Sequence, residues 1–196
     1  MELIYWSYSY KDQGAWPALS RARAEFGENP KRSSEPDLIA VSDRTMFWIE
    51  AKITATNKTT PSNPQATKNY LSGGDEWHRF VFNTDFGTIA IDSKFYELYR
   101  FWLLGTWAAA QTSRDFFLVN LVRSGRDDDI ERRFGQYIEQ DPNKTFRRFT
   151  WEDIYRHISL IGDSGPERDL LLDYFQEKTV GYNSQRELQH AFNLLA

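Results

Sequence analysis

Two apolar runs joined by a short polar turn constrain this chain more than any other feature of its sequence. The runs cover residues 37–41 and 45–53, and Ser42-Asp43-Arg44 lies between them. Short runs of strand-forming residues on either side of a tight turn predict a β-hairpin. If the turn is centred on its last two residues, the resulting register places Asp37 opposite Glu50.

Three charged side chains gather at one end of this hairpin. Residues that lie opposite one another, or two apart on one strand, share a face of a sheet, so Asp37, Glu50 and Lys52 project to the same side. The remaining side chains of both faces are apolar. We therefore expect the hairpin to be covered on both sides and to open only at its charged end. The apolar positions are Leu38, Ile39, Ala40, Val41, Met46, Phe47, Trp48 and Ile49.

The two carboxylates that face each other across this hairpin repel, so something must compensate them. A raised pKa of one acid, a cation such as Lys52, or a bound metal ion would do so. Two carboxylates that share a hard divalent cation suit Mg²⁺, with Mn²⁺ as a substitute. Lys52 would then lie beside the metal-bound water. The alternative interpretation is a cross-strand salt-bridge cluster at a sheet edge, with no catalytic role.

The spacing of this motif is similar to that of a known enzyme family. Pro36-Asp37, twelve intervening residues and Glu50-Ala51-Lys52 resemble the signature of the PD-(D/E)XK nucleases, the restriction-endonuclease-like superfamily. The resemblance implies a metal-dependent endonuclease that hydrolyses DNA phosphodiester bonds with an activated water, in restriction-type defence or in repair. It also implies that Asp37, Glu50 and the backbone carbonyl of Ala51 bind Mg²⁺, and that Lys52 assists the attacking water.

Other positions match the family more loosely. Members often add a catalytic acid from a preceding helix, and Glu25 is the natural candidate, with Glu28 and Glu35 as competitors. Some members place a Gln, Lys or Tyr on the helix after the motif, which assigns a catalytic role to Gln65. Substrate contact is expected from side chains that flank the motif or follow it, namely Lys31, Arg32, Lys58, Lys68 and Tyr70.

A second acid-x-Lys triplet, Asp92-Ser93-Lys94, tests how specific the motif is. It lacks a paired apolar hairpin, and it lies where a helix is expected to start. We therefore interpret Asp92 or Ser93 as a helix N-cap. The first triplet differs in its register, its apolar flanks and the preceding Pro-Asp.

The rest of the chain alternates between strand-like and helix-like segments, which predicts an α/β fold, bordering on α+β, with a mixed central sheet flanked by helices. Residues 1–125 are expected to form the nuclease core, and residues 126–196 a largely helical C-terminal extension packed on the same domain. Expected helices cover residues 14–27, 63–71, 94–112, 129–139, 166–177 and 184–195. Expected strands outside the hairpin cover residues 3–10, 80–82, 88–91 and 116–122, and two further segments of unassigned type cover residues 146–149 and 151–158.

Composition limits the classes of function. The hydrophobic content of 40% supports a packed core, while a net charge of −4 argues against a protein that holds nucleic acid by charge alone. The absence of Cys excludes thiolate zinc sites. No segment suits a signal peptide or a membrane span, so we expect a cytoplasmic protein without a membrane partner.

Three functions stay open at this point. The first is a DNA endonuclease, for which cutting both strands of a duplex would favour a homodimer. The second is a nuclease fold without activity that serves as a DNA-binding or structural domain of a larger assembly. The third is a carbohydrate-active protein, suggested by the seven Trp and the acidic net charge. In the third case Lys52 would have no required role.

Overall fold

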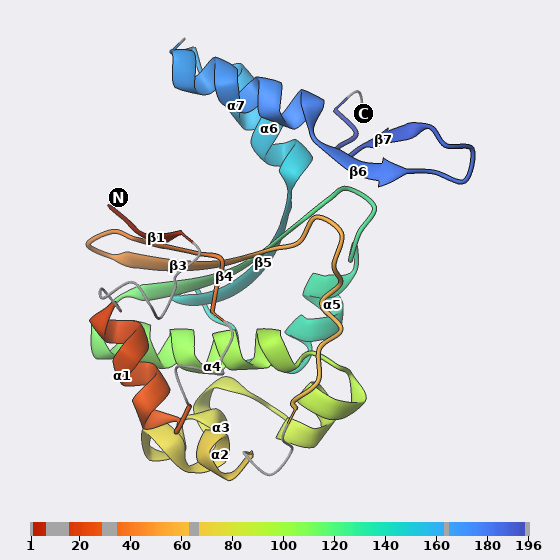
Figure 1. Cartoon of the computed structure of the whole chain (residues 1–196). Coiled ribbons are helices and arrows are strands. Elements are labelled where there is room, and N and C mark those ends of the chain that lie inside the picture. Colours follow the sequence, from red (N-terminus) through yellow and green to blue (C-terminus); the bar gives the residue numbers. More distant parts are fainter. Residues whose placement is uncertain (1, 7–15, 29–34, 63–66, 163–164, 195–196) are drawn as a thin grey trace.

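The computed structural model describes residues 2–6, 16–28, 35–62, 67–162 and 165–194. A five-stranded sheet in the order β1-β2-β3-β4-β5 lies at the centre of the molecule (Figure 1). The first three strands are antiparallel, and β3, β4 and β5 are parallel, so the sheet is mixed as expected for the α/β class. The strands are β1 (Glu2–Trp6), β2 (Leu38–Val41), β3 (Thr45–Ala51), β4 (Asp115–Val122) and β5 (Lys144–Thr150).

The predicted hairpin and its register are confirmed. Strands β2 and β3 pair antiparallel, with Leu38 opposite Ile49 and Val41 opposite Met46. Continued by one residue, this register places Asp37 opposite Glu50. The alternation of side chains along both strands is therefore the one that the sequence indicated.

One face of the sheet, here called the inner face, packs against helix α4 (Tyr96–Gln111). Met46 and Trp48 project from β3 to this face and are fully buried. Trp48 meets Phe101 of α4 edge-on, with ring centroids 6.3 Å apart. At Gly105 a Cβ atom would lie 2.1 Å from the Phe116 ring, so only glycine allows α4 to approach β4 this closely.

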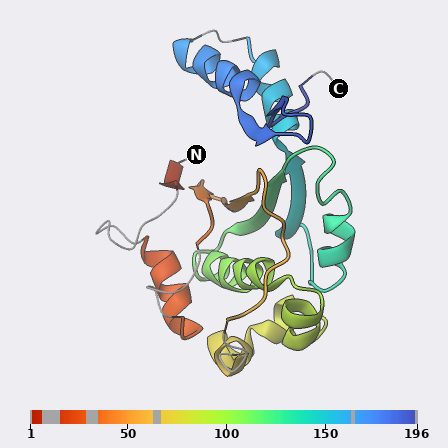
Figure 2. The same cartoon turned by 45° about the vertical axis from the view of Figure 1, so that its right-hand side comes forward.

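Further helices lie around α4, most of them on the side away from the sheet (Figures 1 and 2). They are α1 (Pro17–Glu25), α2 (Thr67–Glu76), α3 (His78–Val81), the short π-helix η2 (Gly87–Asp92) and α5 (Ile130–Gly135). In the ranges that the structure describes, no helix is both long and apolar enough to cross a membrane.

The opposite, outer face of the sheet is less covered than expected. Leu38, Phe47 and Ile49 are only half-buried there, because no helix among the described residues packs flat against them as α4 does on the inner face. The prediction of a hairpin covered on both sides is therefore wrong for this face. Above it rise the last elements of the chain: α6 (Trp151–Leu160), α7 (Pro166–Glu177), β6 (Thr179–Tyr182) and β7 (Leu188–His190).

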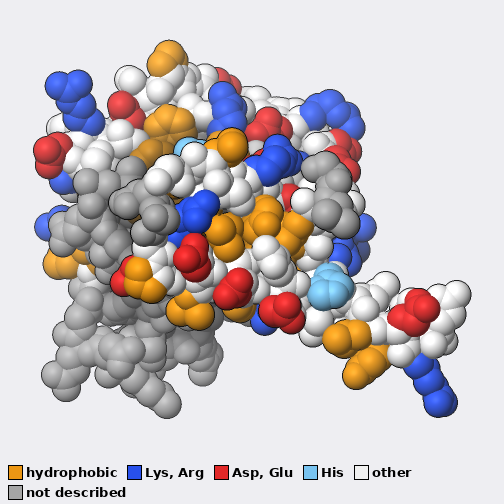
Figure 3. Space-filling view, turned by 90° about the horizontal axis from the view of Figure 1, so that it is seen from above, with side chains coloured by type: hydrophobic (Ala, Val, Ile, Leu, Met, Phe, Trp, Pro, Cys, Tyr) orange, Lys and Arg blue, Asp and Glu red, His pale blue; other side chains and the backbone are white. Residues whose placement is uncertain are grey.

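These last elements form a C-terminal unit, residues 151–194, with a small core of its own around Phe175 and Phe192. Strand β5 precedes this unit and belongs to the main sheet, and its Phe146 lies in the main core. The main sheet thus runs past residue 125, where the sequence suggested a boundary, to Thr150. Figure 3 shows the molecule from above. On the face seen there, acidic side chains lie next to hydrophobic ones, and the β6–β7 hairpin projects to one side.

Three predicted elements have the wrong type. Residues 80–82 and 88–91, expected as strands, belong to or adjoin α3 and η2. Both carboxylate oxygens of Asp85 accept hydrogen bonds from Thr88, which stabilises the start of η2. Residues 184–195, expected as a helix, contain β7 instead, because the Asn183 side chain accepts hydrogen bonds from the backbone N–H groups of a turn, those of Gln185 and Glu187.

The expected N-cap of α4 is also wrong. Asp92 lies within η2, and the helix begins only at Tyr96. The hydroxyl of Thr59, from the loop after β3, accepts a hydrogen bond of 2.9 Å from the backbone N–H of Glu97. A residue distant in the chain thus caps α4 and ties its first turn to the loop that follows the motif.

Candidate active site

The end of β3 brings the motif residues together. Glu50 projects to the inner face and is 3% exposed. Lys52 follows it on the same side, and its Nζ donates hydrogen bonds to Glu50 Oε1 and, at 2.8 Å, to Glu97 Oε2. The backbone N–H of Lys52 donates to the Leu121 carbonyl at 2.7 Å, which fixes the strand end on β4. The Lys52 ammonium therefore bridges two carboxylates, one from the sheet and one from α4.

Asp37 lies just before β2 and is exposed, unlike Glu50. Its Oδ2 accepts a hydrogen bond of 2.7 Å from the backbone N–H of Ala51. The carboxylate thus occupies the place of the next backbone acceptor in the β2–β3 ladder. It also lies close enough to Glu50 for its charge to raise the pKa of that side chain. The structure therefore brings Asp37, Glu50, Ala51 and Lys52 to the same end of the hairpin, although Glu50 points to the inner face and Asp37 lies exposed beside the outer face.

Glu97, in the first turn of α4, is the site residue that the sequence analysis missed. Its position near a helix N-terminus favours a negative charge. The available signal was that Glu97, like Arg100, is a charged residue inside a largely apolar helix, and such a residue requires a partner when the helix is buried. The identity of the partner was not available, because Lys52 lies 45 residues away in the chain.

The electrostatics of the cluster favour additional positive charge. Burial, together with the charges of Glu97 and Asp37, raises the pKa of Glu50 to about 8, although Lys52 opposes the shift. Burial alone would lower the pKa of Lys52, but Glu50 and Glu97 raise it above its ordinary value, so the ammonium stays charged. Glu50 Oε2 is buried and finds no hydrogen-bond partner among the described residues. Three carboxylates thus surround one ammonium.

A pair of buried amides continues this polar region across the sheet. Asn120 of β4 lies beside Glu50 in the parallel register and is fully buried. It exchanges two hydrogen bonds of 3.0 Å with Asn57, which also donates to Asp127 Oδ2 at 2.8 Å. This exchange fixes the loop after Lys52 against the sheet. No local sequence pattern predicts these hydrogen bonds, since Asn57, Asn120 and Asp127 come from three separate segments of the chain.

Tyr70 is corrected from a substrate contact to a core residue. It is 5% exposed, and its hydroxyl donates to Glu28 Oε1 at 2.9 Å. The Glu28 side chain is buried and also accepts two hydrogen bonds from Arg100, at 2.7 and 2.6 Å. Since Glu28 is held in this ion pair, it does not replace Glu25 as the acid contributed by the first helix.

Glu25 is not brought to the site. It ends α1 on the side of the molecule away from the sheet, where its Oε1 accepts a hydrogen bond of 2.9 Å from Gly74 N–H. The direction of α1 decides this, because the helix runs away from the end of β3 (Figure 1). The further acid that the structure places beside Lys52 is Glu97.

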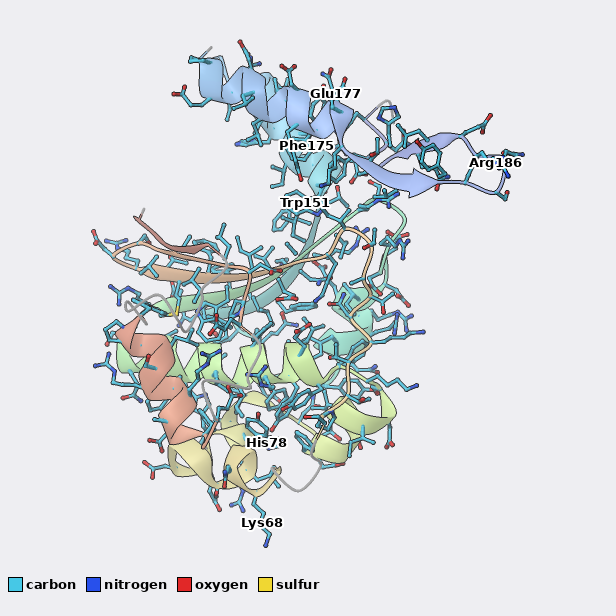
Figure 4. All side chains as sticks on the ribbon, viewed as in Figure 1. Lys68, His78, Trp151, Phe175, Glu177 and Arg186 are labelled. Carbon is cyan, nitrogen blue, oxygen red and sulfur yellow. The ribbon has the colours of Figure 1, made fainter. Side chains whose placement is uncertain are left out.

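The predicted cationic contacts have different outcomes. Lys68 is exposed on α2 and points away from the sheet at the opposite side of the molecule (Figure 4), so the structure separates it from the site. Lys58 is exposed in the loop beside Thr59, next to the first turn of α4, and it stays a predicted contact. Three predicted residues lie outside the described part of the chain: Lys31, Arg32 and Gln65.

Comparison with known proteins adds no family assignment. No family model matches the chain, and neither a curated protein nor a solved structure matches it. A functional interpretation therefore depends on the geometry of the site.

Proposed function

We propose that this protein is a metal-dependent endonuclease that hydrolyses DNA phosphodiester bonds. The observation that carries the proposal is the meeting of Asp37, Glu50 and Lys52 at the end of β3, where a third carboxyl group, that of Glu97, also accepts a hydrogen bond from Lys52. A cytoplasmic location and a homodimer that cuts both strands of a duplex belong to the same proposal.

The residues present fit a hard divalent cation. In the described ranges no three acidic or histidine side chains are already arranged to hold a metal ion by themselves. Mg²⁺ commonly takes one or two carboxylates and completes its shell with water and substrate phosphate. Asp37, Glu50 and the Ala51 carbonyl would hold it, and the unpartnered Oε2 of Glu50 offers a donor atom. Such an ion, when bound, lowers the pKa of a coordinated water and neutralises charge on the phosphate.

Lys52 has a defined task in this proposal. An ammonium has three N–H donors, and Glu50 and Glu97 accept two hydrogen bonds from Lys52. The remaining donor is suited to orienting the attacking water or a phosphate oxygen. The pKa of Lys52 lies above its ordinary value, so it serves as a fixed positive charge and not as a general base.

Plasmid cleavage tests the proposal. Supercoiled and linear DNA would be incubated with the wild type and with Lys52→Ala and Asp37→Asn, in the presence of Mg²⁺, Mn²⁺ or EDTA. We expect metal-dependent cleavage that falls at least about a hundred-fold in both variants. The matched controls are Lys94→Ala and Asp92→Asn, which alter the second acid-x-Lys triplet and should keep full activity.

The same experiment has an outcome that removes the proposal. A wild type that cleaves no DNA, and that binds no Mn²⁺ in a manner dependent on Asp37 and Glu50, would leave a DNA-binding or structural domain as the better interpretation. Equal loss of activity in the Lys52 and Lys94 variants would show that the first triplet has no special role.

A further inference from the structure

A pocket of about 320 Å³ opens on the outer face of the sheet, directly behind the candidate active site. Asp37 and Ala51 belong both to its lining and to the site. The rest of the lining is apolar and comes from β2, β3, the loop after it, β4 and the start of α6: Leu38, Ile49, Ile53, Leu121 and Trp151. The volume falls at the lower end of the range of roughly 300–1,000 Å³ found for small-molecule sites.

Trp151 forms the wall of this pocket on the side of the C-terminal unit (Figure 4). A capping box holds it in place, because Thr150 Oγ1 accepts from Asp153 N–H and Asp153 Oδ2 accepts from Thr150 N–H, each at 3.0 Å. The indole packs on Phe175 and Phe192, with ring centroids 6.1 and 6.0 Å away. The pocket is therefore a preformed space between two packed parts of the chain.

We infer that this pocket receives an unpaired base of the DNA strand whose phosphate lies at Asp37 and Glu50, an inference that rests on the proposed function. The walls are apolar, and Asp37 is the only charged side chain among the described residues that line them. A neutral heterocycle fits such a lining, since its faces pack on apolar and aromatic side chains while an exocyclic amino group donates to a carboxylate.

The charge of the chain supports the same conclusion. Affinity for an intact duplex comes mainly from Lys and Arg that neutralise phosphates. The net charge is −4, and the lysine of the site is already bonded to two carboxylates. Stacking of a base adds affinity that does not depend on net charge. The preferred substrate is therefore DNA with a bulged, mismatched or single-stranded nucleotide at the cleavage position.

Two substitutions on the same strand and the same face distinguish an effect of this pocket from a general effect on the sheet. Ile49→Trp fills the pocket. Phe47→Trp adds bulk two residues earlier, where Phe47 stacks on Phe117 at 5.1 Å and does not line the pocket. The probes are a labelled intact duplex and the same duplex with a single bulged 2-aminopurine, with Ca²⁺ in place of Mg²⁺. Fluorescence anisotropy measures affinity, and 2-aminopurine emission reports stacking.

The wild type should bind the bulged DNA about ten-fold more tightly than the intact duplex and quench its emission. Ile49→Trp should lose this preference and Phe47→Trp should keep it. Equal affinity for both DNAs, or an equal effect of the two substitutions, would overturn the inference. If Mg²⁺-dependent plasmid cleavage persists in that case, the nuclease proposal stands without the pocket. If the protein binds neither DNA, both fail.

Discussion

Two ionic clusters lie one helical turn apart on α4, and they differ in the balance of their charges. Around Arg100, a buried guanidinium donates two hydrogen bonds to Glu28, and Tyr70 donates to the same carboxylate. Around Lys52, a single ammonium bridges Glu50 and Glu97, with Asp37 nearby. In the first cluster both carboxylate oxygens of Glu28 accept hydrogen bonds. In the second, one buried carboxylate oxygen of Glu50 has no partner among the described residues.

This difference separates a structural cluster from a functional one. A buried ion pair with good geometry holds elements together, and removing one partner is costly because the other charge is left unpaired. A cluster with excess negative charge is unfavourable by itself and becomes favourable when a cation binds. We therefore expect the Arg100 cluster to stabilise the fold and propose that the Lys52 cluster carries the proposed chemistry.

The largest expected effect is on the structural cluster. Arg100→Met leaves Glu28 buried without its main partner and should lower the free energy of unfolding by about 3–5 kcal/mol. The control is Arg79→Met, which removes an exposed ion pair with Glu76 and should cost less than about 1 kcal/mol. Urea denaturation measures both, and similar losses in the two variants would contradict the structural role.

Metal addition should have the next largest effect on the free energy of unfolding, and this effect should depend on the Lys52 cluster. Mn²⁺ at a hundred times its dissociation constant should stabilise the wild type by about 2.7 kcal/mol, because it binds the folded chain. Thermal unfolding with Mn²⁺ and with EDTA measures the difference. The stabilisation should vanish in Asp37→Asn, and its persistence there would place the ion elsewhere.

A smaller effect of opposite sign sharpens the comparison. Without metal, Glu50→Gln removes a carboxyl group whose ionisation burial makes unfavourable, since its pKa is raised to about 8, so the substitution should raise the free energy of unfolding by about 1 kcal/mol. Glu28→Gln should lower it instead, because it removes the buried negative charge that pairs with Arg100. If Glu50→Gln and Glu28→Gln both lower the free energy of unfolding, the distinction between the clusters is lost.

His78 provides the smallest effect, as a buried ionisable side chain that stacks on Phe82. Burial lowers its pKa below the ordinary value of 6.5, with a smaller contribution from Arg79 against an opposing one from Asp85. The unfolded chain therefore binds a proton first as the pH falls, and stability decreases below pH 6.5. The wild type should lose stability relative to His78→Gln between pH 7 and pH 5, by roughly 1 kcal/mol or less. A stability difference between the two proteins that stays constant over this pH range would contradict the prediction.

The sequence predicted the parts of this site that depend on local pattern. The register that joins Asp37 and Glu50 follows from side-chain alternation around a short turn, and the antiparallel pairing of β2 with β3 leaves no freedom once one face is buried. The inner strand β4 was equally clear from its composition, which is apolar from Phe116 to Val122 except for Asn120. These features need no knowledge of distant segments.

The predictions that failed concern features that depend on tertiary packing. Glu97 reaches Lys52 only because α4 crosses beneath the sheet with its N-terminus at the end of β3. Glu25 is excluded by the direction of α1, which no local pattern encodes. Short apolar segments such as residues 80–82 fit a strand and a helix equally well, and contacts with α4 decide between them.

The central claim is that the Lys52 cluster binds a divalent cation, and calorimetric titration with Mn²⁺ tests it most directly. We predict one ion per chain for the wild type, loss of binding in Asp37→Asn and Glu50→Gln, and retention in the exposed control Asp92→Asn. Binding of the same strength in all four proteins, or none in the wild type, would contradict the account.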